Sequence, residues 1–112
     1  MGKLSRDKGK RGEREVVALL RKHGFEARRG QQFRGGSDSP DIIHNMEGFY
    51  IEVKLRQNLN LYDTIDVAMT EKKSHEDVLV FHRKNARPWL ITMDAGDFLE
   101  LMEEFYELRS RP

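Results

Sequence analysis

Residues 49–56, FYIEVKLR, alternate between apolar and polar side chains near the middle of this 112-residue chain. A period of two is typical of a β-strand that places one face in a core and the other face toward polar surroundings. The stretch therefore predicts a strand with two chemically different faces. The apolar face would carry Phe49, Ile51, Val53 and Leu55, and the polar face Tyr50, Glu52, Lys54 and Arg56.

An acidic residue is expected opposite Glu52 on the preceding strand. Residues 41–44 predict that strand, and residues 45–48 predict a turn. If the turn has four residues, Asp41 faces Glu52 with Cβ atoms roughly 4.5–5.5 Å apart, although a β-bulge would shift this register. Lys54 lies on the same face, about 6.5 Å further along the strand. The spacing thus predicts two carboxylates and an ammonium group at one place.

A third acid belongs to a predicted helix over residues 5–23. Glu13 lies in line with the apolar stripe of this helix, which is formed by Val16, Val17 and Leu20. A glutamate buried on that face needs a partner. The partner is either a metal ion shared with the other acids or a nearby lysine or arginine.

Carboxylates in this pattern suit metal-assisted hydrolysis of phosphodiesters. Oxygen ligands fit Mg²⁺, with Mn²⁺ as a substitute, and metal-bound water is a usable nucleophile. Lys54 would orient that water or stabilise the developing charge, and Glu13 would serve a second metal or its waters. The predicted catalytic residues are Glu13, Asp41, Glu52 and Lys54. The predicted metal ligands are Glu13, Asp41, Glu52 and the carbonyl oxygen of Val53.

The remaining pattern predicts the other elements of an α/β fold. Gly24 ends the first helix, residues 25–29 predict an edge strand, and residues 30–40 predict a loop. A second helix begins near Asn60, with an inner face of Leu61, Ile65, Ala68 and Met69. Strands follow at residues 78–82 and 89–93, with Phe81 and Trp89 as core residues. Asp94 caps a last helix, whose apolar residues face the core or a second subunit: Phe98, Leu101, Met102 and Phe105.

The element order is therefore α-β-β-β-α-β-β-α. It predicts one domain over residues 1–112, with a mixed central sheet of about five strands flanked by helices. No apolar run approaches the roughly 20 residues that span a bilayer, and the chain has no cysteine. The basic N-terminus lacks the apolar stretch of a secretory signal. We therefore expect a cytoplasmic protein without a membrane partner.

Charge is distributed unevenly along the chain. Residues 1–36 carry eleven basic and four acidic side chains, a net charge of +7, whereas the remainder carries −6. Such asymmetry predicts that the N-terminal third meets a polyanion, although a solvated basic helix face is the alternative. Candidate phosphate contacts are Lys8, Lys10, Arg11, Arg28, Arg29 and Arg34.

Several motifs resemble known nucleases. Pro40-Asp41 followed by Glu52-Val53-Lys54 resembles the signature of the PD-(D/E)xK superfamily, which has a restriction-endonuclease-like core. Residues 8–9, 13–15 and 22–25 resemble the opening of the archaeal-type Holliday junction resolvases, the Hjc family. Residues 60–63 and 82–89 resemble bacteriophage-encoded members. The resemblance covers roughly residues 8–105.

The resemblance implies more than the residues do. It implies a homodimer that binds a four-way DNA junction and nicks two strands symmetrically, with Mg²⁺ as cofactor. It implies that Glu13 completes the metal site, that Arg14 touches DNA, and that Ser37 positions a phosphate. Ser37 alternatively caps its own loop. If the chain is phage-encoded, the cytoplasm would be that of a bacterial host.

Two other functions remain open. One is a nuclease of the same core that acts on flaps, mismatches or linear duplex. The other is a DNA-binding module with an inactive nuclease core, whose sequence would lack one acid or the lysine. The presence of Glu13, Asp41, Glu52 and Lys54 together favours an active enzyme.

Overall fold

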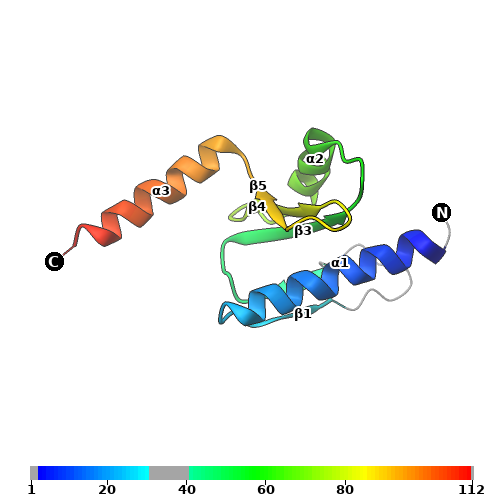
Figure 1. Cartoon of the computed structure of the whole chain (residues 1–112). Helices are drawn as coiled ribbons and strands as arrows, with labels where there is room; N and C mark the ends of the chain where they lie inside the picture. The colour runs from blue at the N-terminus through cyan, green and yellow to red at the C-terminus, as the bar shows by residue number, and fades with distance from the viewer. Residues whose placement is uncertain (1–2, 31–40, 112) are drawn as a thin grey trace.

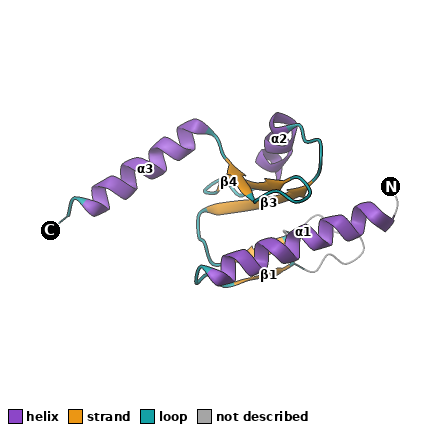
Figure 2. Cartoon of the chain, in the orientation of Figure 1, coloured by secondary structure: helices purple, strands orange, loops and turns teal. Residues whose placement is uncertain are grey.

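The computed structural model describes residues 3–30 and 41–111, with side chains from Asp7 onward in the first helix. Its elements are α1 (Lys3–Lys22), β1 (Ala27–Arg29), β2 (Ile42–His44), β3 (Phe49–Leu55), α2 (Leu61–Glu71), β4 (Asp77–Arg83), β5 (Leu90–Thr92) and α3 (Ala95–Arg109). Figure 2 shows these helices and strands along the chain. Their order is the predicted one, and the mixed α/β class is confirmed.

The strands of the described residues fall into two sheets. β3 pairs in parallel with β4, and β5 pairs antiparallel with the other edge of β4. β1 and β2 form a separate antiparallel pair. Figure 1 shows α1 and α2 on opposite sides of the three-stranded sheet. The predicted mixed sheet is thus present, but β2 and β3 are not hydrogen-bonded neighbours.

This division corrects the predicted pairing of Asp41 with Glu52 across a hairpin. The turn between β2 and β3 is held at both ends by other strands. Asn45 exchanges hydrogen bonds with Glu26, next to β1. At the other end, Asp77 of β4 donates its backbone N–H to the carbonyl of Gly48 at 2.8 Å. These long-range bonds direct the two strands into different sheets.

The main core lies between α1 and the three-stranded sheet. Val16, Val17 and Leu20 of α1 pack with Ile51, Leu79 and Phe81, and all six are buried. Gly12 permits this close approach, because a Cβ there would lie 3.3 Å from both Val53 and Leu55. The apolar face predicted for β3 therefore meets α1.

The predicted stop of α1 is confirmed. Gly24 has a φ of +91°, which suits glycine. Its N–H donates to the Arg21 carbonyl, and the N–H of Phe25 donates to the Leu20 carbonyl, both at 3.0 Å. This pair of bonds satisfies carbonyls at the end of the helix.

A smaller core lies under α2. The Asn60 side chain accepts a hydrogen bond from the Asp63 N–H, so the predicted cap is confirmed. Ala68 is buried against Val78 and Val80, with Leu61 and Ile65 beside it. Met69 is instead 46% exposed, and Thr64 is buried in its place. The prediction of Met69 as an inner residue was wrong.

The last helix leaves the rest of the molecule. Asp94 caps α3 as predicted, but none of its residues is buried. Figure 1 shows α3 projecting from the end of β5. Of the two alternatives for its apolar residues, packing in the core of this chain is not observed, because Phe98 and Phe105 are each 44% exposed. Within the described residues, no helix has the length and apolar character needed to cross a membrane.

Candidate active site

Glu52 lies on β3, at the edge of the three-stranded sheet, and is only 7% exposed. The Lys54 ammonium lies 3.7 Å from the Glu52 carboxylate. Burial, with smaller contributions from the carboxylates of Asp41 and Glu71, raises the pKa of Glu52 to about 7. The Lys54 ammonium opposes this rise. Glu52 is therefore a buried acid close to two other acids and one cation.

Asp41 lies immediately before β2 and is half-buried. Its charge raises the pKa of Glu52 and also that of Glu13. Although Asp41 does not pair with Glu52 in a β-ladder, it thus lies within electrostatic range of both other acids. Of the four predicted catalytic residues, Glu52 and Lys54 are in direct contact, while the charge of Asp41 raises the pKa of both Glu13 and Glu52.

Glu13 projects from α1 and has a specific partner. The Arg29 Nε donates a hydrogen bond to the Glu13 carboxylate at 3.0 Å. Burial raises the pKa of Glu13, while Arg29 lowers it. Arg29 was predicted to contact DNA, and here it neutralises an acid. The predicted alternative of a nearby lysine or arginine as the partner of Glu13 is therefore confirmed, and a shared metal ion stays a prediction.

The donor chemistry of this site fits a divalent cation. Asp41 raises the pKa of both Glu13 and Glu52, and a cation would relieve that repulsion. Their oxygen atoms are the ligands that Mg²⁺ prefers. In the described part of the chain, however, no three acidic or histidine side chains already stand close enough to hold one ion. Three-ligand binding would therefore need side-chain rotation, and Glu13 has one carboxylate oxygen outside its hydrogen bond with Arg29.

Sequence reasoning missed two residues beside Glu52. The Tyr50 hydroxyl donates a 2.6 Å hydrogen bond to the Glu71 carboxylate at the end of α2. Burial and this hydrogen bond raise the pKa of Tyr50, so the phenol remains protonated. The alternation of β3 placed Tyr50 on the polar face, but nothing local indicated that Glu71 would meet it.

The predicted DNA contacts on α1 and β1 are mostly at the surface. Lys10, Arg11, Arg14 and Arg28 are exposed, and Lys8 is half-buried. Arg34 and Ser37 lie outside the described residues, as does Pro40 of the nuclease motif. Exposed basic side chains of α1 and β1 are therefore positioned to meet a polyanion, although Arg11 also pairs with Glu15.

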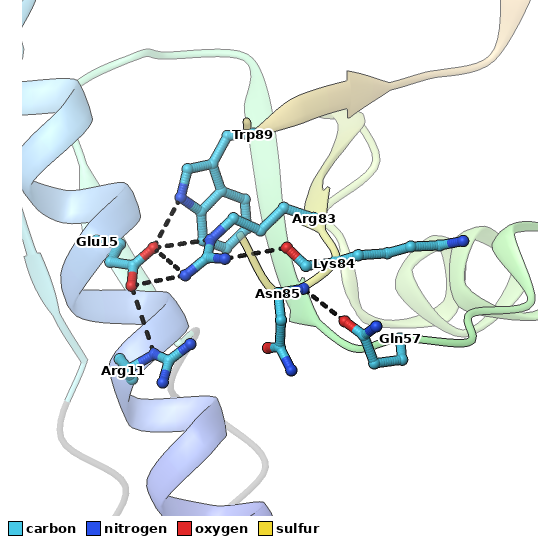
Figure 3. A network of polar contacts seen from close by, with 7 residues as sticks. All are labelled: Arg11, Glu15, Gln57, Arg83, Lys84, Asn85 and Trp89. Carbon is cyan, nitrogen blue, oxygen red and sulfur yellow. Dashed lines mark hydrogen bonds and ion pairs between the residues drawn. The ribbon is translucent and has the colours of Figure 1, made fainter. Parts of the chain in front are cut away.

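A second polar network joins α1 to the strand β4 and the loop after it (Figure 3). The Glu15 carboxylate accepts two hydrogen bonds from Arg83, each at 2.9 Å, and one from the Trp89 indole at 3.0 Å. Arg11 adds an ion pair at 3.5 Å. Trp89 was predicted as a core residue. Its ring is half-buried against the main core, while its indole N–H contacts Glu15. We call Arg11, Glu15, Arg83 and Trp89 the Glu15 cluster.

A small mixed α/β fold with acids and a lysine gathered at one sheet edge is a framework suited to phosphodiester chemistry. The family model described as archaeal Holliday junction resolvase (Hjc) matches residues 4–105. The chain belongs to this family, which supports a role as an endonuclease that resolves Holliday junctions.

One solved structure supports the same fold. It is Hjc of Archaeoglobus fulgidus, described as a Holliday junction resolvase from an archaeal hyperthermophile. The TM-score is 0.57 and the sequence identity is 24%, over 76% of each chain. A comparison with curated proteins finds no match.

Proposed function

We propose that this chain is a metal-dependent Holliday junction resolvase with a PD-(D/E)xK active site. Membership of the Hjc family supports the junction as substrate. The observation that supports the site most directly is the burial of Glu52, which is only 7% exposed, with the Lys54 ammonium 3.7 Å from its carboxylate. The charge of Asp41, which precedes β2, raises the pKa of Glu52 on β3 and of Glu13 on α1.

Each residue has a proposed role. Asp41 and Glu52 would hold Mg²⁺ or Mn²⁺, together with the Val53 carbonyl, and Glu13 would orient a second ion or its waters. Bound there, the metal supplies a water of lowered pKa and neutralises charge on the phosphate. Lys54, close to Glu52, orients the attacking water or stabilises charge on the phosphoryl oxygens. The basic side chains of α1 would hold the phosphate backbone, without reading base sequence.

A homodimer is part of the proposal. Symmetric nicking of two strands requires two active sites, and one chain carries one site. The support in this structure is α3, whose apolar side chains find no cover in the described chain. The resemblance of residues 60–63 and 82–89 to phage proteins supports a bacteriophage origin. The enzyme would then act on DNA in the cytoplasm of a bacterial host.

The central experiment compares cutting of a synthetic four-way junction with cutting of a linear duplex of the same sequence. We expect Mg²⁺-dependent cutting of the junction, abolished by chelator, and little cutting of the duplex. If the duplex is cut as well or better, the chain is a nuclease of another kind.

The active-site assignment has its own test. Asp41→Ala removes a proposed metal ligand and no phosphate contact, so it should abolish cutting and leave junction affinity within about twofold. Cutting measured at saturating enzyme separates the two effects. Wild-type turnover by Asp41→Ala would refute the assigned site.

A further inference from the structure

A basic pocket lies at the carboxyl ends of the parallel strands β3 and β4. Its volume is about 560 Å³, and its polar lining consists of Arg56, Gln57, His82, Arg83, Lys84 and Arg87. Leu55 and Arg83 are register partners, so Arg56 emerges next to the end of β4. None of the described residues that line the pocket is acidic.

Two of the lining residues are already satisfied by protein partners. Arg83 belongs to the Glu15 cluster, where a carboxylate offsets its charge. A 2.8 Å hydrogen bond joins the His82 ring to the Thr92 hydroxyl, and burial lowers the pKa of His82, so it is a poor cation. The pocket's available positive charge therefore comes from Arg56, Lys84 and Arg87.

These three cations have no ion-pair partner in the described part of the chain. Figure 3 shows the Lys84 side chain directed away from Glu15. Three like charges around one concavity repel one another, and a bound anion would relieve that repulsion. The arrangement is thus suited to an anionic ligand.

The loop that carries Lys84 and Arg87 is fixed by local structure. The Arg87 N–H donates to the Lys84 carbonyl at 3.2 Å, closing a turn. Ala86 within it has a φ of +58°, which is unfavourable for a residue with a Cβ. The Gln57 side chain accepts a hydrogen bond from the Asn85 N–H and ties the loop to the end of β3. A strained and tethered turn holds its side chains ready for a ligand.

We propose that the basic pocket is a second phosphate-binding site, which holds a backbone phosphate of the bound DNA away from the cut. This inference rests on the proposed function. Arg56 follows Glu52 by four residues, or about 13 Å along an extended strand. At about 3.4 Å of helix axis per nucleotide, the held phosphate lies roughly three to five nucleotides from the scissile one. Two separated contacts would fix the angle of a DNA arm as well as its position.

The first test removes the two loop cations with Lys84→Gln/Arg87→Gln. The matched control is Lys72→Gln/Lys73→Gln. It removes two charges just after the C-terminal end of α2, whereas the N-terminal residue of α2, Leu61, lines the pocket. Affinity for a four-way junction and for a linear duplex is measured in chelator over a range of KCl concentrations. We expect the pocket variant to bind about tenfold more weakly, with a salt slope shallower by about 1–2. The control should stay within twofold of wild type.

Failure of the inference differs from failure of the proposed function. If wild type cuts the junction but the pocket variant binds like the control, the pocket is not a phosphate site. If wild type shows no preference for the junction but the pocket variant weakens binding to both DNAs, the pocket stands and the resolvase proposal fails. Thermal unfolding followed by circular dichroism verifies that both variants fold.

A second test locates the phosphate. Single backbone phosphates of the junction are replaced one at a time by neutral methylphosphonates. Wild type should lose affinity at a position about three to five nucleotides from the cut, whereas Lys84→Gln/Arg87→Gln should be insensitive there. A phosphate profile that is the same for both proteins overturns the proposal.

Discussion

Glu52 is a carboxylate that the folded chain holds at a cost in stability when it is charged. Its pKa rises from 4.5 to about 7 because burial, Asp41 and Glu71 outweigh the attraction of Lys54. A folded state with the higher pKa binds more protons between these values, so the free energy of unfolding falls as pH rises through this range. The full effect is about 3 kcal/mol, from about 1.36 kcal/mol per pKa unit.

Glu52→Gln should therefore raise the stability of the metal-free protein while abolishing cutting. The gain relative to wild type should be absent near pH 4, grow between about pH 4.5 and 7, and stay constant above pH 7. Urea unfolding in chelator at several pH values measures it. Parallel pH profiles for the two proteins would show that Glu52 does not carry this destabilising charge.

In the presence of Mg²⁺, the charged Glu52 should stabilise the folded protein instead of destabilising it. Mg²⁺ that binds only the folded state stabilises it, increasingly with concentration above the dissociation constant. At pH 8 we expect Mg²⁺ to raise the melting temperature of wild type and to leave that of Glu52→Gln nearly unchanged. An equal shift in both proteins would place metal binding elsewhere.

At the scale of elements, α1 is positioned by a glycine that the sequence pattern did not single out. A Cβ at position 12 would press on Val53 and Leu55, whereas a Cβ at position 9 would meet nothing within 4 Å. Both glycines lie in the same helix. Substitutions at Gly9 and Gly12 therefore distinguish the effect of helix propensity from the effect of packing against β3.

Gly12→Val should lower the free energy of unfolding by about 1–3 kcal/mol through overpacking. Gly9→Val should be neutral or slightly stabilising, because glycine is the poorer helix former. Denaturant unfolding compares the two variants. Cutting by Gly12→Val should also fall, since α1 carries Glu13. Equal stability of the two variants would mean that α1 does not approach β3 this closely.

Elements set by local chemistry were predictable from the sequence. Gly24 ends α1, and the caps Asn60 and Asp94 begin their helices, because each acts on backbone groups within a few residues. The pairing of β2 was not predictable, because it depends on Asn45 meeting Glu26 and Gly48 meeting Asp77. No local pattern ranks such competing contacts.

In the candidate site, too, some features follow from local sequence and others depend on long-range contacts. The spacing of Glu52 and Lys54 is fixed by one strand, and Glu13 follows from the helical stripe. The partners could not be predicted, because they join distant segments: Arg29 to Glu13, Glu71 to Tyr50, and Trp89 to Glu15. Sequence spacing proposes which groups carry chemistry, while the long-range fold decides which charge balances each of them.

At the scale of the whole molecule, the exposed apolar residues of α3 suggest how two sites are joined. The helix extends away from the body and leaves several large apolar side chains exposed: Phe98, Leu99, Phe105, Tyr106 and Leu108. An amphipathic helix gains most of its stability from tertiary packing. A second copy of the chain would provide that packing and complete the proposed pair of active sites.

Phe98→Gln/Phe105→Gln should convert a dimer into a folded monomer, as measured by sedimentation velocity. The matched control, Glu100→Gln/Glu104→Gln, changes two polar positions of the same helix and should stay dimeric. Wild type that sediments as a monomer at micromolar concentration would contradict the dimer proposal.

Loss of the dimer should also change the products on a supercoiled plasmid, because a first nick relaxes the plasmid and removes the cruciform unless the second strand is cut in the same encounter. On a supercoiled plasmid that extrudes a cruciform, paired cuts by wild type give linear DNA. The Phe98→Gln/Phe105→Gln monomer keeps Glu13, Asp41, Glu52 and Lys54, so it should still make single cuts and accumulate nicked circles. Linear product at the wild-type proportion would mean that α3 does not couple the two cuts, even if the dimer is lost.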